Sequence, residues 1–224
     1  MPHAPEKPCT LSSLLPAKTF IGTSSILRYG GRFLYGVRPP RREGSLVVIE
    51  LTGIGGGLEV DDESVTEALL REVREEIGCS VRLVPCAETV VVHGPERTER
   101  THLQGKELPA AVVLRGHRTP PQQPWHRESQ GTSCIVVYLG EVEGRPRPSR
   151  ELSAVIWLHP AHVVNTARED VPLMTLLESG AELVEAKPGS LPRTGWVRLT
   201  DSQEALVLAL RDDAFFYYER MLNG

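Results

Sequence analysis

One acidic helix constrains this chain more than any other segment. Residues 64–67 read Ser-Val-Thr-Glu, a spacing in which the serine hydroxyl accepts the N–H three residues on and the glutamate reaches back. Gly78 supplies the stop, because glycine tolerates the left-handed backbone that ends many helices. One face of the segment is apolar, through Val65, Leu69, Val73 and Ile77. The sequence therefore predicts an amphipathic helix over residues 65–77.

Three glutamates of this helix, Glu72, Glu75 and Glu76, flank the apolar stripe and overlap its edge. Like charges at this spacing destabilise a helix by about 0.2–0.5 kcal/mol per pair. Packing gives no reason for such an arrangement, whereas a bound divalent cation does. Mg²⁺ prefers carboxylate oxygens and commonly bridges them to substrate phosphates. A solvated acidic face is the alternative reading of the same pattern.

The charge of the chain is concentrated in the same place. The net charge is −4, yet residues 57–79 alone hold eight acidic and two basic side chains, so the remainder is slightly basic. A nucleic-acid-binding protein usually shows a basic excess, and none is present. No apolar run approaches the roughly 18 residues of a membrane span. We therefore expect neither nucleic acid nor a membrane as partner.

The cysteines and the N-terminus indicate a cytoplasmic protein. No two of the four cysteines, Cys9, Cys79, Cys86 and Cys134, have the CxxC spacing of a zinc or redox pair. Reduced thiols are the simpler interpretation. The proline-rich start lacks the basic and apolar regions of a secretory signal.

Strand patterns outnumber helical ones up to residue 158. Strands are predicted at residues 19–28, 32–38, 46–51, 81–93, 109–115, 133–142 and 152–158, the first two joined by a tight turn at Tyr29-Gly30-Gly31. Later residues predict helices at 171–179 and 203–222, the second capped by Thr200 and Gln203, and short strands at 182–186 and 196–199. The fold class is α+β, a mixed sheet with helices packed on it. We divide the chain into an N-terminal tail (1–17), a core domain (18–165) and a C-terminal extension (166–224).

Residues 57–79 carry the pattern Gly57-x5-Glu63-x7-Arg71-Glu72-x2-Glu75-Glu76-x-Gly78, with Cys79 where an aliphatic residue is usual. This resembles the Nudix box of the Nudix hydrolases. Asp62 departs from the usual loop pattern, because glycine is common at its position. The resemblance covers about residues 18–165 and implies an α/β/α sandwich with a mixed sheet.

The resemblance also implies a chemistry. Nudix hydrolases bind Mg²⁺ or Mn²⁺ and cleave a diphosphate joined to another moiety by attack of water on phosphorus. The metal ligands would be Glu72, Glu75, Glu76 and the backbone carbonyl of Gly56. Gly57, Glu63 and Gly78 would be structural positions of the box, and Arg71 would hold a glutamate toward the metal. Glu75, Glu76, Arg71 and Glu151 are the implied catalytic residues, and Glu128 is a second candidate for the general base.

The substrate is less determined than the chemistry. The resemblance implies a small nucleoside diphosphate derivative, and Pro95 with the polar residues after it resembles the ADP-ribose pyrophosphatase branch. Arg38, Arg41, Arg42, Arg97 and Arg100 are candidates for phosphate contacts. A non-catalytic nucleotide sensor of the same fold is the alternative function. A homodimer is left open, with the aromatic residues 215–218 as a core or dimer contact.

Overall fold

The computed structural model describes residues 9–15, 20–94, 97–106, 108–115, 133–149 and 151–210. Its helices are α1 (Leu11–Leu14), α2 (Val65–Ile77), α3 (Pro160–Arg168), α4 (Leu173–Glu178) and α5 (Asp201–Leu210). Its strands are β1 (Phe20–Tyr29), β2 (Arg32–Val37), β3 (Arg41–Glu43), β4 (Leu46–Thr52), β5 (Ser80–Val84), β6 (Thr89–Gly94), β7 (Arg97–Thr101), β8 (Ala111–Arg115), β9 (Ser133–Glu143), β10 (Ala154–Leu158), β11 (Val171–Pro172), β12 (Glu182–Glu185) and β13 (Trp196–Leu199).

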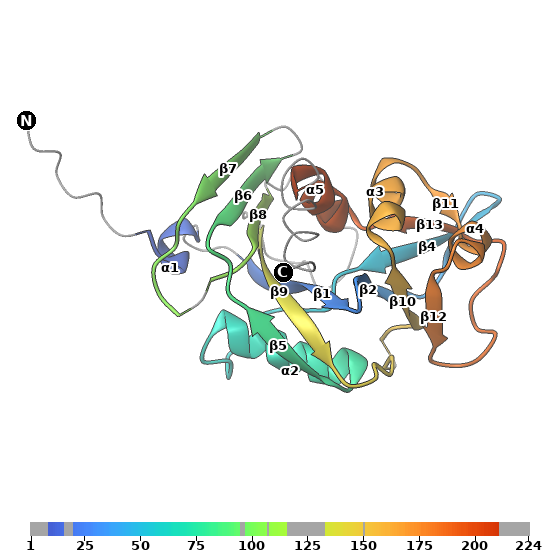
Figure 1. Ribbon diagram of the computed structural model, residues 1–224, viewed down its shortest axis with the longest axis horizontal. Coiled ribbons are helices and arrows are strands. Elements are labelled where there is room, and N and C mark those ends of the chain that lie inside the picture. The colour runs from blue at the N-terminus through green and yellow to red at the C-terminus, as the bar shows by residue number, and fades with distance from the viewer. Residues whose placement is uncertain are drawn as a thin grey trace, which may run out of the picture.

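The described strands form one mixed sheet between two layers of helices (Figure 1). The main order is β11-β13-β4-β2-β1-β9-β8-β6-β7, and β10, β12, β3 and β5 pair beside it. Alternate side chains of the strands fill two cores. One core holds Leu27 with the apolar face of α2, and the other holds Val37 with residues of α3 and α5. The predicted α/β/α sandwich with a mixed sheet is confirmed.

The helix predicted over residues 65–77 is confirmed at both ends. The Oγ of Ser64 accepts the N–H of Glu67 at 3.1 Å. The Glu67 carboxylate accepts the N–H of Glu63 at 2.8 Å, one residue before the expected position. Gly78 has φ 61° and donates its N–H to the carbonyl of Arg74. The termini of α2 are therefore fixed by local sequence.

The turn predicted between the first two strands is also confirmed. Gly30 and Gly31 have φ values of 56° and 76°, and Tyr29 pairs with Arg32 across them. Positive φ at both central positions is the geometry that matches the twist of a two-residue hairpin. Glycine adopts it without steric cost.

Several predicted elements are wrong in detail. The strand predicted over 81–93 is two strands, β5 and β6, and the short strands β3 and β7 were not predicted. The helix predicted over 171–179 is β11 followed by the shorter α4. The predicted capping box of α5 is absent, because Oγ1 of Thr200 and Oε1 of Gln203 have no hydrogen-bond partner within the described part of the chain; Nε2 of Gln203 instead donates to Oγ of Ser24 on β1 at 3.0 Å. The predicted loop 116–131 and the end of the last helix lie outside the described residues.

The C-terminal part of the chain contributes strands to the same sheet. β12 pairs with β10, and β13 lies parallel to β4. At the other end of the chain, Leu11 of α1 is buried in the core on the α2 side. The division into a tail, a core domain and an extension stays a prediction.

Two observations bear on partners and redox chemistry. No helix of the described segments has the length and apolar character to cross a bilayer. All four cysteines are free thiols.

Candidate functional site

The glycine-rich loop before α2 runs along the first strand. The carbonyl of Gly56 accepts the N–H of Thr23 at 2.7 Å, and the N–H of Leu58 donates to the carbonyl of Ile21 at 3.0 Å. Gly55 has φ 149°, and a Cβ there would lie 2.4 Å from the carbonyl oxygen of Thr23. Only glycine fits this approach. The loop is therefore held in place against β1, beside α2.

Two carboxylates of α2 converge on this loop. Glu76 is only 7% exposed, and its Oε2 accepts the N–H of Gly55 at 2.9 Å. The Glu72 carboxylate lies against Gly56 so closely that a Cβ on that glycine would be 2.2 Å from Oε1. The loop backbone thus orients the Glu76 carboxylate through a hydrogen bond and leaves room for the Glu72 carboxylate at Gly56.

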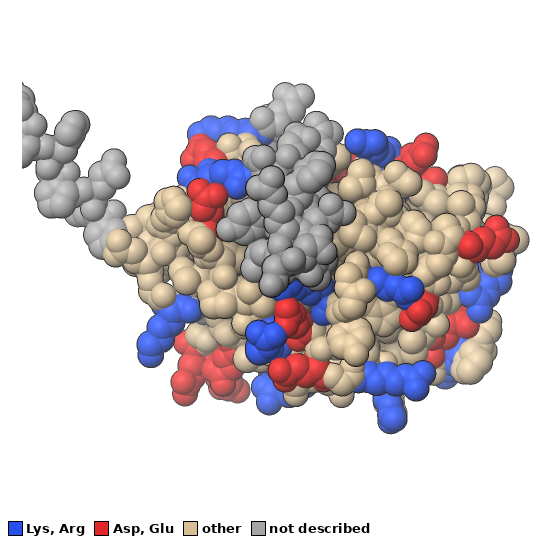
Figure 2. All heavy atoms as spheres, viewed as in Figure 1, with Lys and Arg blue, Asp and Glu red and all other residues tan. Residues whose placement is uncertain are grey.

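The electrostatics of the pair favour a cation. The pKa of Glu76 is raised to about 7, mainly by burial; the charges of Glu72 and Glu151 contribute to the rise, and the Gly55 N–H and Arg38 oppose it. Burial also raises the pKa of Glu72, against the opposing effect of its ion pair with Arg71. Figure 2 shows acidic side chains at the edge of the molecule where Figure 1 places α2.

The donor chemistry of this pair fits a hard divalent cation, because carboxylate oxygens are the ligands such ions prefer. Within the described segments, no three His, Cys, Asp or Glu side chains are close enough together to hold a metal ion. The geometry therefore presents two converged carboxylates, those of Glu72 and Glu76, with further carboxylates nearby.

Arg71 connects the loop to the helix. Its guanidinium donates to both carboxylate oxygens of Asp62, at 3.2 and 3.0 Å, and to the carbonyl of Gly57 at 3.0 Å. It also donates to Oε1 of Glu72 at 2.9 Å. The hydrogen bond from Arg71 lowers the pKa of Asp62. Arg71 therefore links Glu72 to the loop; its role in holding a glutamate toward a metal stays a prediction.

The loop carboxylate that pairs with Arg71 is that of Asp62. Glu63, which the resemblance gave as a structural position of the box, is the next residue; it is exposed, and its N–H donates to Glu67. The structural role of Glu63 stays a prediction. The signal available in the sequence was the aspartate in place of the usual glycine.

This contact gives a matched pair of variants. Asp62→Asn removes the charge that pairs with Arg71, and we expect activity to fall by about tenfold or more, since a partner that orients a ligand typically contributes that much. Glu63→Gln removes a neighbouring carboxylate that makes no contact with Arg71, and we expect less than a threefold change. Measuring the turnover of both purified variants tests this expected difference in activity. Equal losses would show that Asp62 has no special role.

The other predicted ligands are less directly placed. Glu75 is 60% exposed, and its Oε2 lies 3.3 Å from Nη1 of Arg71. The carbonyl oxygen of Gly56 accepts both the N–H and, at 3.3 Å, the hydroxyl of Thr23. To bind a metal, the Glu75 carboxylate and the Gly56 carbonyl would each have to give up a contact that they make in this structure. Glu128 lies outside the described residues.

Glu151 is brought to the site by the chain that follows β9. The N–H of Arg147 donates to the carbonyl of Ile77 at 2.8 Å, and the N–H of Ser149 donates to the backbone carbonyl of Glu76 at the same distance. These bonds satisfy carbonyls at the C-terminal end of α2, which have no partner inside the helix. Glu151 lies two residues after Ser149, is exposed, and raises the pKa of both converged carboxylates.

Among the predicted phosphate-binding arginines, Arg38 is distinguished by its position. It is exposed at the end of β2, and its charge opposes the pKa rise of Glu76. Arg41 pairs instead with Glu43 and Glu50, Arg97 with Glu99, and Arg100 with Glu88.

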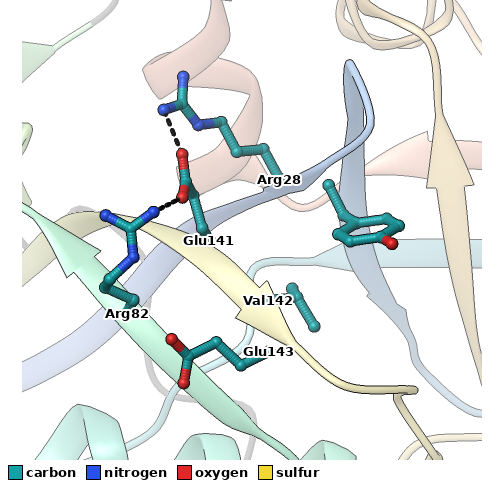
Figure 3. A pocket seen from close by; sticks show the side chains of 6 residues that line it. Arg28, Arg82, Glu141, Val142 and Glu143 are labelled. Carbon is teal, nitrogen blue, oxygen red and sulfur yellow. Dashed lines mark hydrogen bonds and ion pairs between the residues drawn. The ribbon is translucent and has the colours of Figure 1, made fainter.

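A separate cavity of about 210 Å³ lies at the far end of β1. Figure 3 shows Glu141 of β9 between Arg28 of β1 and Arg82 of β5. Arg28 is buried, and its Nη2 donates to Glu141 at 2.6 Å, while Nε and Nη1 have no partner. The lining includes Glu143, so two arginines face two glutamates. This balanced charge is unsuited to a diphosphate.

The buried guanidinium makes Glu141 important for stability. Glu141→Ala would leave Arg28 buried without a carboxylate, and we expect a loss of about 1–3 kcal/mol in the free energy of unfolding. Glu143→Ala, on the same strand and exposed, is expected to change it by less than about 0.5 kcal/mol. Chemical denaturation of both variants measures the difference. Equal stability of the two variants would contradict the assignment.

Comparison with known proteins gives one family. A family model described as the NUDIX domain matches residues 25–177. No curated protein matches the chain. A solved NUDIX hydrolase from Nitrosomonas europaea is 18% identical, with a TM-score of 0.42 over 72% of this chain and 87% of that one. An ADP-ribose pyrophosphatase from Streptococcus suis is 14% identical, with a TM-score of 0.38 over 87% and 91%. A MutT NUDIX hydrolase from Burkholderia pseudomallei is 20% identical, with a TM-score of 0.37 over 64% and 85%.

Proposed function

The chain belongs to the NUDIX domain family, and we propose that it is a metal-dependent hydrolase that cleaves the diphosphate linkage of a nucleoside diphosphate derivative. The observation that carries this proposal is the convergence of Glu72 and Glu76 on the loop at Gly55 and Gly56. Two partly or fully buried carboxylates side by side are costly without a cation.

The residues of the site have separable roles in this proposal. A divalent cation, Mg²⁺ or Mn²⁺, would neutralise the diphosphate and lower the pKa of bound water. Glu72 and Glu76 would hold it, with Glu75 and the Gly56 carbonyl as further ligands. The Gly55 N–H fixes one oxygen of Glu76, and Arg71 fixes one oxygen of Glu72.

Two exposed groups complete the site. Glu151 is exposed, and its charge raises the pKa of both carboxylates, so it is the candidate that accepts a proton from the attacking water. Arg38 offers a positive charge close enough to Glu76 to oppose the rise of its pKa. A guanidinium there would bind a phosphate oxygen of the substrate.

The substrate within this class is proposed from the sequence. The segment beginning at Pro95 favours ADP-ribose, with nucleotide sugars next. Pro95 itself lies outside the described residues, between β6 and β7. We expect a small-molecule substrate and a cytoplasmic location.

A substrate screen tests the proposal. The protein is incubated with ADP-ribose, nucleotide sugars, dinucleoside polyphosphates and nucleoside triphosphates, each with Mg²⁺ or Mn²⁺, and products are separated by ion exchange. We expect turnover of at least one nucleoside diphosphate derivative, abolished by EDTA. Binding of a nucleotide without turnover of any compound would instead establish the sensor alternative.

A further inference from the structure

An exposed aromatic ring lies at the start of β1, next to the loop of the site. Phe20 is 56% exposed. A Cβ on Gly57 would lie 3.3 Å from Cζ of Phe20, so the ring rests against the backbone of this glycine. Gly22 and Gly57 form an isolated antiparallel bridge, which aligns the loop with the strand.

The ring and the carboxylates lie on opposite sides of this short stretch of loop. The Cβ direction of Gly56 meets Glu72, and that of the next residue, Gly57, meets Phe20. Successive residues of an extended chain point to opposite sides. The backbone of Gly56 and Gly57 therefore lies between the two groups, and each group packs directly against it.

Phe20 differs in position from the other exposed aromatic residues of the described chain. Tyr29 is 67% exposed, but it lies at the opposite end of β1, about 30 Å along the strand. Trp196 pairs with Val48 on β4. Stacking of a flat apolar partner on a solvent-exposed phenyl ring is favourable, and every nucleobase has such a face.

We propose that Phe20 is the residue on which the base of the substrate stacks. The inference rests on the proposed function and adds a contact that determines its substrate class, namely compounds with a nucleobase. One ribose separates the base from the diphosphate, a span suited to passing from the ring around Gly57 to Glu72 and Glu76. The base would cover the exposed surface of the ring.

Kinetics give the first test. Phe20→Ala is expected to raise KM for a nucleoside diphosphate derivative about 5- to 100-fold with kcat nearly unchanged, the range of base stacking on an aromatic ring. Phe20→Leu keeps an apolar side chain but no aromatic face, and we expect its KM to rise nearly as much as that of Phe20→Ala. Phe20→Trp keeps an aromatic face, and we expect its KM to stay near that of the unmodified protein. Tyr29→Ala is the control and should behave as the unmodified protein. Unchanged KM in Phe20→Ala would overturn the inference and leave the hydrolase proposal intact.

A binding measurement tests Phe20 without turnover. In Phe20→Trp the new indole fluorescence is expected to change on titration with α,β-methylene-ADP and to stay constant with methylenediphosphonate, which lacks the base. An absent response to the nucleotide, or an equal response to both compounds, would refute stacking. Failure of the hydrolase proposal would show differently, as absence of turnover by the unmodified protein.

Discussion

Glu76→Gln should abolish turnover while making the metal-free protein more stable. The substitution removes the charge of the most buried carboxylate at the site, whose Oε2 accepts the N–H of Gly55. A glutamine oxygen can still accept that bond, so the loop should keep its position. We expect the rate of hydrolysis to fall by at least about 100-fold, because the charge that would hold the cation is gone.

The stability effect follows from the pKa of the same group. Burial raises the pKa of Glu76 from 4.5 to about 7. Between these values the folded state binds more protons than the unfolded state, so the contribution of Glu76 to stability falls as the pH rises through this window. Above pH 7 the penalty is complete, at about 1–3 kcal/mol. In EDTA at pH 8, Glu76→Gln should therefore raise Tm by about 3–10 °C.

The pH dependence supplies the control. The gain in Tm should shrink as the pH falls from 7 and approach zero below pH 4.5, where Glu76 is protonated in both states. Glu75→Gln neutralises an exposed carboxylate of the same helix and should change stability by less than about 0.5 kcal/mol at either pH. A stability loss in Glu76→Gln at pH 8 would show that the ionised carboxylate stabilises the fold.

Gly56→Ala should disable the site without unfolding the domain. The new Cβ would lie 2.2 Å from Oε1 and 2.3 Å from Cδ of Glu72, and the carboxylate cannot retreat freely because Arg71 holds Oε1. Displacing a reacting group by about 1 Å can cost about 100-fold in rate. We expect a loss of that size, with a stability cost of about 1–3 kcal/mol for the overpacking.

Gly22→Ala is the matched control for this substitution. Its Cβ would meet neighbours at 3.6 Å and beyond, which are ordinary contacts. We expect activity within threefold of the unmodified protein and little change in Tm. If Gly56→Ala were as active as Gly22→Ala, the close packing of Glu72 against the loop would not matter for catalysis.

Local signals predicted the parts of the fold that local geometry decides. The cap at Ser64 and the stop at Gly78 determine α2, and the Gly30-Gly31 pair determines the first hairpin. The unpredicted strands β3 and β7 are short and largely charged, so they carry no apolar alternation. Pairing with neighbouring strands forms them, and a single sequence does not show that pairing.

The candidate site also has parts that the sequence predicts and parts that only the structure shows. The positions of Glu72 and Glu76 at the edge of the apolar stripe are visible on a helical wheel, and both are drawn inward in the structure. Glu75 lies further round the helix and is exposed. The contact of Asp62 with Arg71 depends on the path of the loop, which no spacing rule describes. Phe20 required the structure, because only the register of β1 with the loop brings it to Gly57.

Binding of Mn²⁺ tests the central claim most directly, since it asks whether the carboxylates of Glu72 and Glu76 act together on one cation. Electron paramagnetic resonance would follow free Mn²⁺ during titration of the unmodified protein, Glu72→Gln, Glu76→Gln and the remote variant Glu143→Gln. We expect both helix variants to bind at least about tenfold more weakly and Glu143→Gln to bind as the unmodified protein does. Equal affinity in all four proteins would contradict the metal site and the hydrolase built on it.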